Sequence, residues 1–267
     1  MNKPSTPSWL PSKPLDRGNA AEQILQGLRA QILDGQFPRG AKLPSEKQLA
    51  EGYGVSGATI REAIRGLTTT GLVEVRHGSG AYVTADVDQL IDTPLRSMIQ
   101  MERIGVSEVL GVLGALNAYA AELATVHATR EDLDRMRQAL DAIDKAQDAQ
   151  AISAGLSAFI AEWARASGNP LLGVLCRFLG SLQIGLAREL CSDSLANLQK
   201  TVRGLSKERQ LLVDAIEARD AQAARTAARI YHECAIKVIT ALPRADATFV
   251  SDPTLSSLLA PADGRPG

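Results

Sequence analysis

The sequence contains few of the residues that build disulfide networks and metal sites. Only three cysteines and three histidines occur among its 267 residues. The cysteines, Cys176, Cys191 and Cys234, are odd in number and include no CxxC pair, which is typical of free thiols in a reducing compartment. The sequence therefore favours neither a disulfide framework nor a cysteine-based zinc site.

Signals for secretion, membrane insertion and catalysis are also missing. No basic-then-apolar leader pattern occurs at the N-terminus. The longest apolar run, LLGVLCRFLGSLQIGL, is interrupted by Arg177 and is shorter than the roughly 20 residues of a membrane helix, so it predicts a buried helix. A nucleophile elbow, a phosphate loop and a Cys/His pair at catalytic spacing are absent too. We therefore expect a cytoplasmic protein that spans no membrane and is not an enzyme.

Charge is distributed unevenly along the chain. Residues 1–85 contain ten Lys and Arg against seven Asp and Glu, whereas the remainder contains 19 against 23. A mildly basic smaller part attached to an acidic larger part indicates that only the N-terminal part of the chain contacts a polyanion. The length and an apolar content of 45% are ordinary for two soluble globular domains.

The N-terminal part has the hydrophobic pattern of three short helices. Residues 1–18 are rich in Pro, Ser and Lys and predict a flexible arm. A helical apolar pattern then begins at Ala20 and stops near Gly35. Ser45 predicts the start of a second helix, with Gln48 completing a capping box. A third helix is expected from an N-cap at Ser56 to just before Gly71.

Two short β-prone runs follow the third helix. LVEVR and AYVTA flank HGSG, whose glycines permit the positive φ of a tight hairpin. Within the third helix, one stripe is apolar and is predicted to face the core: Ile60, Ala63, Ile64 and Leu67. Three helices and a hairpin predict a winged helix-turn-helix.

The opposite face of the third helix is small and polar. Arg61 and Arg65 are four residues apart, so both point the same way and could contact guanine edges or phosphates. Ser56 and Thr59 near the helix N-terminus suit phosphate anchoring. An ordinary solvated helix is the alternative, but the adjoining hairpin, with Arg76 and His77, favours nucleic-acid binding.

This pattern resembles the GntR family of bacterial transcription regulators. The resemblance runs from about Ala20 to Thr84 and rests on ILDGQFPRGAKLPSEKQLAEGYGVSGATIREAIRGLTTTGLVEVRHGSGAYV. It implies a double-stranded DNA operator as the partner. The family's operator-contacting positions correspond to Lys47, Ser56, Thr59, Arg61, His77 and Gly78.

Residue 57 departs from the family pattern, because Gly57 stands where the family usually has Arg. Loss of that side chain is expected to change the operator sequence or the affinity, with compensation from Lys47, Arg65 or Arg76. The alternative is that Gly57 only relaxes the start of the helix.

Beyond residue 86 the pattern is helical almost throughout. One segment places Leu133, Met136, Leu140 and Ile143 on a single face, and no alternating strand pattern competes. Three blocks resemble the all-α (FCD) effector domain of the FadR-type branch: VSEVLGVLGALNAYAAELATVHATREDLDRM, FIAEWARASGNPLL and ERQLLVDAIEARDAQAARTAARIYHE. The predicted fold class is therefore mainly α, a winged helix-turn-helix followed by an antiparallel all-α helical bundle.

The resemblance also implies a metal site that this sequence does not supply. Most members of the all-α class bind a divalent ion through one Asp and three His. The corresponding positions here are Leu156, Ile160, Arg209 and Tyr231, which offer no such ligand set. His232 neighbours the last position but is turned by about 100° on the helix; it is expected either to line the bundle interior or to lie at the surface. We therefore expect neither a metal nor another cofactor.

The effector implied by the resemblance is expected to differ from small metal-chelating acids. Leu113 stands where the family often has an Arg for an acidic effector, between Gly111 and Gly114, which either make room for a ligand or let two helices approach. An effector of low charge, an acyl or aromatic compound, fits better, with Arg209 able to anchor a polar or anionic end. The polar groups expected at its cavity are Glu162, Asn169, Arg209 and Tyr231.

These observations predict a dimeric, sequence-specific DNA-binding regulator. We expect a repressor that binds a short palindrome and is released by an effector; the alternative is an effector-free architectural or partner-controlled DNA binder whose helical domain only dimerises. The expected organisation is an arm at 1–18, the winged helix-turn-helix at 19–85, a linker at 86–100, the effector and dimerisation domain at 101–245 and a flexible tail at 246–267.

Overall fold

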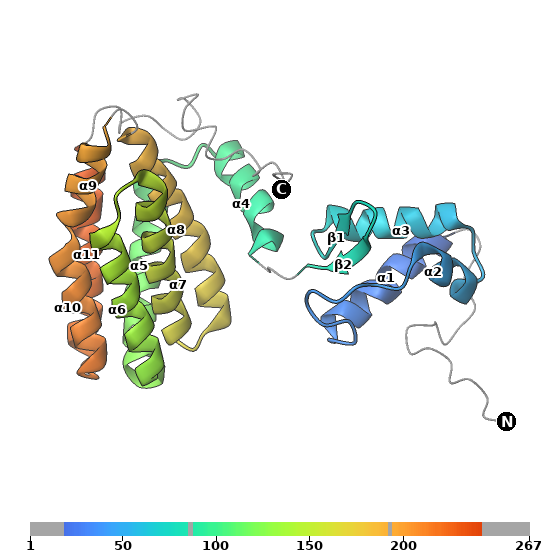
Figure 1. Ribbon diagram of the computed structural model, residues 1–267, viewed down its shortest axis with the longest axis horizontal. Helices are drawn as coiled ribbons and strands as arrows, with labels where there is room; N and C mark the ends of the chain where they lie inside the picture. Colours follow the sequence, from blue (N-terminus) through green and yellow to red (C-terminus); the bar gives the residue numbers. More distant parts are fainter. Residues whose placement is uncertain (1–18, 85–87, 192–193, 242–267) are drawn as a thin grey trace. The chain divides into compact units, whose positions relative to one another are not determined.

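A computed structural model describes residues 19–84, 88–191 and 194–241. The chain divides into two compact units, Met1–Ile91 and Asp92–Gly267, and each is described by itself (Figure 1). The arm predicted at 1–18 and the tail predicted at 246–267 lie outside the described residues.

The first unit has the predicted three helices and hairpin. Ser45 caps the second helix in a reciprocal capping box with Gln48, and Ser56 caps the third by accepting a hydrogen bond from the Thr59 backbone N–H. Both predicted caps are confirmed, and so is the winged helix-turn-helix. The elements are α1 (Ala20–Leu33), α2 (Glu46–Tyr53), α3 (Gly57–Thr69), β1 (Val73–Arg76) and β2 (Gly80–Val83).

The core of the first unit explains how α3 is held. The predicted stripe on α3 is buried, and α3 packs against α1, α2 and β1. Its partners include Ile24 and Leu28 of α1 and Leu49 of α2, all fully buried. Burial of this apolar stripe leaves the opposite face of α3 in solvent.

The hairpin has a third, unpredicted strand-like neighbour. β1 and β2 pair antiparallel, from Val73 opposite Val83 to Arg76 opposite Gly80. The segment 40–43 then lies along the other edge of β2, where the Leu43 N–H donates to the Ala81 carbonyl at 2.8 Å. The wing is therefore supported by backbone hydrogen bonds on both sides of β2.

The segment predicted as a linker at 86–100 is largely helical. Helix α4 runs from Gln89 to Met101. The boundary between the two units falls within it, after Ile91.

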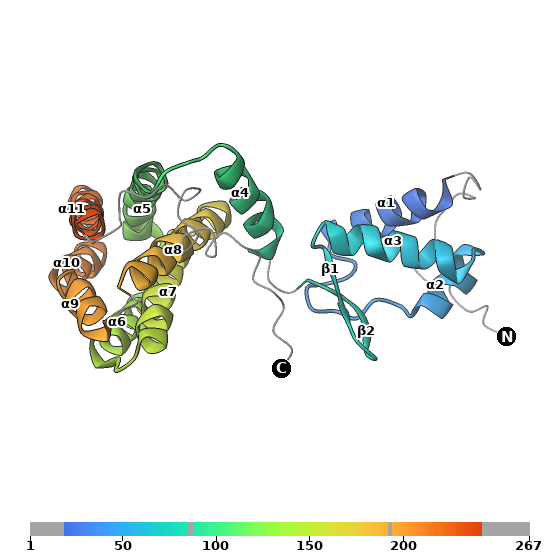
Figure 2. The same ribbon diagram turned by 90° about the horizontal axis from the view of Figure 1, so that it is seen from above.

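The second unit is the predicted antiparallel helical bundle (Figures 1 and 2). Helices α5 and α11 lie side by side, as do α6 and α7, α7 and α8, and α10 and α11. The helices are α5 (Val106–His127), α6 (Arg130–Lys145), α7 (Ala149–Ala166), α8 (Pro170–Leu190), α9 (Leu195–Arg203), α10 (Ser206–Glu217) and α11 (Ala221–Thr240).

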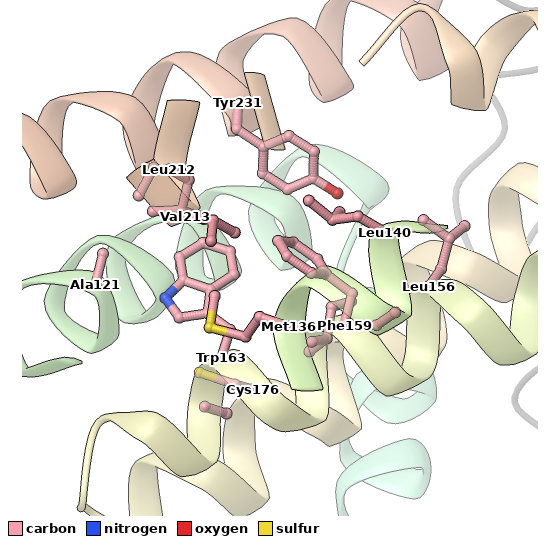
Figure 3. Close-up of a cluster of buried hydrophobic side chains, with 14 of the residues drawn as sticks. Ala121, Met136, Leu140, Leu156, Phe159, Trp163, Cys176, Leu212, Val213 and Tyr231 are labelled. Atoms are coloured by element: carbon pink, nitrogen blue, oxygen red, sulfur yellow. The ribbon is translucent and has the colours of Figure 1, made fainter. Parts of the chain in front are cut away.

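The bundle core is centred on the indole of Trp163. Phe159 on the same helix and Tyr231 on α11 lie beside it, with ring centroids 6.0 and 6.4 Å away (Figure 3). The stripe predicted on α6 is buried, with Met136 next to the indole. Such buried aromatic area contributes much of the stability of a helical bundle.

Two helices, α5 and α8, are long and apolar enough to cross a bilayer by length and composition alone. About half of the most apolar window of α5 and 61% of that of α8 are buried inside the bundle, which is typical of core helices. The prediction that the long apolar run forms a buried helix is confirmed by α8.

Candidate functional site

The exposed face of α3 carries the predicted basic side chains. Arg61, Arg65 and Thr68 are exposed on the side opposite the buried stripe. The Arg61 guanidinium lies 3.5 Å from a carboxylate oxygen of Glu46 on α2, and exposed pairs of this kind contribute little to stability. Arg61 is therefore free to exchange this partner for a phosphate or a base edge.

The N-terminus of α3 presents a compact group of hydrogen-bonding atoms. The hydroxyls of Ser56 and Thr59 lie 2.9 Å apart, beside the first free backbone N–H groups of the helix. Gly57 is the first helical residue, and a Cβ placed there would lie 3.6 Å from the end of the Arg61 side chain. The backbone therefore does not require glycine at this position, and a Cβ there would make only an ordinary van der Waals contact.

The wing carries a second basic group. The Arg76 guanidinium lies over the ring of Tyr82, 4.4 Å from its centroid, and is paired with Glu74. His77 and Gly78 form the exposed turn, and Gly78 has a φ of 71°, which favours glycine.

Lys42 is a wing residue that was not predicted from the sequence. It lies opposite Tyr82 in the added strand segment, with its ammonium 5.8 Å from that ring. The alternation of Ala41, Lys42 and Leu43 was the available signal, since only Leu43 of the three is fully buried. Lys47 lies on α2 rather than the wing and is exposed beside Glu51, 3.9 Å away.

The second unit contains a small cavity among α7, α8, α9, α10 and α11, of about 40 Å³. The four positions that correspond to the family's metal ligands lie around it, although they are up to 75 residues apart. Two of these positions carry aliphatic side chains. Tyr231 contributes a phenol ring, and its hydroxyl points toward Leu140 and Leu156 (Figure 3). These four residues are Leu156, Ile160, Arg209 and Tyr231.

Arg209 is the charged group of this cavity. Its side chain is 1% exposed, and one terminal nitrogen donates to the Val202 carbonyl at 2.7 Å. Among the residues that the structure describes, none forms a hydrogen bond with its Nε. Gln183 of α8 also lines the cavity, and its buried Oε1 has no hydrogen-bond partner among the described residues. Gln183 was not predicted from the sequence, although a polar residue inside the apolar run was a visible signal.

Three residues predicted at the effector site, Leu113, Glu162 and Asn169, do not line this cavity. Glu162 accepts hydrogen bonds from Arg135 and Arg165 in a network of ion pairs. Asn169 caps α8 by accepting a hydrogen bond from the Leu172 N–H at 3.1 Å. Leu113 is fully buried but does not line this cavity. Asn169 stands directly before Pro170 and caps α8, a role that a local sequence pattern can indicate, whereas the ion pair of Glu162 with Arg135 depends on how α6 and α7 pack.

His232 lies in the bundle interior and not at the surface. It is 3% exposed, and its Nε2 is 2.7 Å from the Asn117 side-chain nitrogen. Burial lowers the pKa of His232 to about 4. A Cβ on Gly114 would lie 3.4 Å from the His232 side chain, so this glycine permits close approach of α5 and α11, whereas Gly111 faces open space.

The residues around the cavity do not fit a divalent metal. Aliphatic side chains provide no ligand atoms, and a guanidinium repels a cation. In the described parts of the chain, no three His, Cys, Asp or Glu side chains gather as a metal site requires. The expectation of a metal-free domain thus remains a prediction grounded in the chemistry of these four side chains.

Comparisons with known proteins match both units. Residues 20–83 match the model of the bacterial regulatory proteins, gntR family, and residues 108–232 match the FCD domain. The chain is 31% identical to the HTH-type transcriptional regulator LutR of Bacillus subtilis, over 70% of this chain and 86% of that protein. It is 27% identical to the galactonate operon transcriptional repressor of Escherichia coli, over 79% and 92%. A solved structure, Streptococcus agalactiae GntR, is 25% identical with a TM-score of 0.58, over 80% of this chain and 97% of that one.

Proposed function

This chain belongs to the gntR family of bacterial regulatory proteins and is a DNA-binding transcription regulator with an FCD effector-binding domain; we propose that it is a repressor that binds a short palindromic operator as a dimer. An effector that binds in the helical domain releases the repressor from its operator. Cytoplasmic location and the lack of catalytic activity are parts of this proposal.

The basic face of α3, next to the wing, is the observation that carries the proposal. A helix of this size fits the major groove, and a hairpin beside it can reach the backbone or the minor groove. In this arrangement Arg61 and Arg65 approach base edges or phosphates, and the N-terminus of α3 anchors a phosphate. The wing contributes Arg76, His77 and Lys42.

Substitution of Arg61 tests this surface. Arg61→Ala should weaken specific binding by about 1–3 kcal/mol if the side chain reads a base, or reduce the salt slope by about one if it holds a phosphate. Arg229→Ala is the matched control, because Arg229 is an exposed arginine on α11 of the other unit. Gel-shift titrations at several salt concentrations measure both effects. Unchanged binding by Arg61→Ala would remove Arg61 from the interface.

An exposed apolar stripe on α5 supports the dimer. The side chains alternate at intervals of four and three residues, the spacing of a helix seam that pairs with another helix. Three of them are largely exposed, and Val126 is 73% exposed. The stripe consists of Val112, Leu116, Tyr119, Leu123 and Val126. We propose that a second copy of this chain covers it.

The cavity of the helical domain is the proposed effector site. Its walls are mostly aliphatic, with Arg209, Gln183 and Tyr231 as polar groups, an arrangement that suits a ligand of low charge with an acyl or aromatic part. At about 40 Å³ it is much smaller than the roughly 300–1,000 Å³ of ordinary ligand pockets, so binding requires side chains to move apart.

This small volume favours a second candidate function, an effector-free DNA binder whose helical domain only dimerises. A thermal-shift screen of small metabolites separates the two, because a ligand that binds only the folded state raises its stability by RT ln(1 + [L]/Kd). A compound that raises the melting temperature and releases operator DNA supports the ligand-responsive repressor. A screen without such a compound supports the second candidate.

A further inference from the structure

The cavity of the helical domain contains two buried polar groups that have an atom without a hydrogen-bond partner among the described residues. Arg209 is 1% exposed and its Nε is unpartnered, and Gln183 is 7% exposed with an unpartnered Oε1. Both side chains line the same cavity, although they come from α10 and α8. Buried polar atoms in folded proteins are almost always hydrogen-bonded, so two orphans at one cavity require an explanation.

Arg209 differs from two partly buried arginines of the same unit that are paired with carboxylates. Arg135 is paired with Asp132 and Glu162, and Arg137 is paired with Glu217. Within the described residues, no carboxylate pairs with Arg209, whose one hydrogen bond goes to a backbone carbonyl. A buried charge without a counter-ion is strongly destabilising. Such a cost is compensated when an anion binds.

The geometry of the cavity suits one planar anionic group. An arginine fork recognises a carboxylate through parallel N–H donors, and the free Nε–H of Arg209 is one such donor. The terminal amide of Gln183 can offer either its oxygen or its nitrogen, since the two are interchangeable by a flip, and can therefore donate to a carboxylate oxygen. The remaining walls are largely aliphatic and include Ile184, Leu205 and Ile239.

We propose that Arg209 and Gln183 bind the carboxylate of a short-chain aliphatic monocarboxylate, whose hydrocarbon chain lies along the aliphatic walls of the cavity. This inference rests on the proposed effector site and names its ligand class. The small volume favours a short chain. A dicarboxylate is rejected, because Arg209 is the single charged residue among the described residues that line the cavity.

Melting and titration calorimetry on the full chain, with hexanoate as the probe, test the proposal. Hexanamide has the same chain without the charge, and adipate adds a second carboxylate. Hexanoate should raise the melting temperature and bind at least about tenfold more tightly than either analogue, because charge-assisted hydrogen bonds are the strong ones.

Variants at the two polar residues separate recognition from a structural role. Arg209→Met should abolish the effect of hexanoate and raise the melting temperature of the ligand-free protein, since it removes an unpaired buried charge. Arg209→Lys keeps the positive charge but not the parallel N–H donors of the guanidinium, so it should lose most of the affinity for hexanoate. Gln183→Leu should weaken binding several-fold, and Arg229→Met, on the exposed face of α11, should leave it unchanged.

Several results would overturn the proposal. They are a lack of hexanoate binding, equal binding of hexanamide, an undiminished hexanoate effect in Arg209→Met or Arg209→Lys, and a lower melting temperature of ligand-free Arg209→Met. An uncharged compound that releases operator DNA equally well from the wild type and from Arg209→Lys would overturn this inference and leave the proposed function intact. Hexanoate binding that depends on Arg209 but does not affect operator binding would overturn the proposed regulation instead.

Discussion

Acidification should destabilise the helical unit through His232. The imidazole is buried between α5 and α11, and its Nε2 meets the Asn117 amide 2.7 Å away. Its other neighbours include the rings of Trp163 and Tyr231, with centroids 6.3 and 5.2 Å away. Burial lowers the pKa of His232 from 6.5 to about 4, so the folded protein holds this side chain neutral.

The size and sign of the effect follow from proton linkage. Above pH 6.5 the imidazole is neutral in both states, and its full contribution to stability is present. As the pH falls from 6.5 towards 4, the unfolded chain takes up a proton that the folded chain does not, so the stability falls. At about 1.4 kcal/mol per pKa unit, the loss reaches about 2 kcal/mol at pH 5 and about 3 kcal/mol at pH 4.

Urea unfolding at pH 7.5 and 5.0 measures this loss. In a Trp9→Phe background, Trp163 is the sole indole and reports on the helical unit. His232→Gln should remove about 2 kcal/mol of the pH dependence, whereas the exposed His127→Gln should not. Asp132 does not contribute at these pH values: burial raises its pKa, but hydrogen bonds from Thr129 and Arg135 lower it to about 2. An identical loss in the wild type and His232→Gln would refute the reasoning.

Three further predictions concern the metal, the operator and the dimer. Elemental analysis of protein purified without a metal-affinity tag should find far less than one zinc or nickel per chain, because Leu156 and Ile160 offer no ligand atom and Arg209 repels a cation. About one metal ion per chain, together with a melting temperature that falls on addition of a chelator, would contradict this prediction. Gly57→Arg should change the sequence selected from random DNA or tighten non-specific binding, and an unchanged site and affinity would place residue 57 outside the interface. Val126→Glu should shift the protein towards a monomer in sedimentation, because it buries a charge at the proposed seam; an unchanged dimer would assign the interface elsewhere.

Local patterns in the sequence were sufficient for the elements of the first unit. Ser45 and Ser56 satisfy helix-end donors through residues three positions away, and apolar spacing fixes which face of α3 is buried. The glycines of the wing turn and the two β-prone runs were likewise sufficient to predict the hairpin. The added strand at 40–43 was not predicted, because its partner β2 lies about forty residues away and pairing across that distance leaves little local pattern.

The residues of the effector cavity were only partly predictable from the sequence. The family resemblance identified Leu156, Ile160, Arg209 and Tyr231 as one set, and their chemistry by itself argued against a metal. Only the tertiary structure decided that Gln183 joins them and that no carboxylate of the described residues pairs with Arg209. The sequence determined the helices, their buried faces and the family because these depend on neighbours within a few residues. Which polar side chains remain unpaired depends on how five helices pack together, and this is decided only by the tertiary structure.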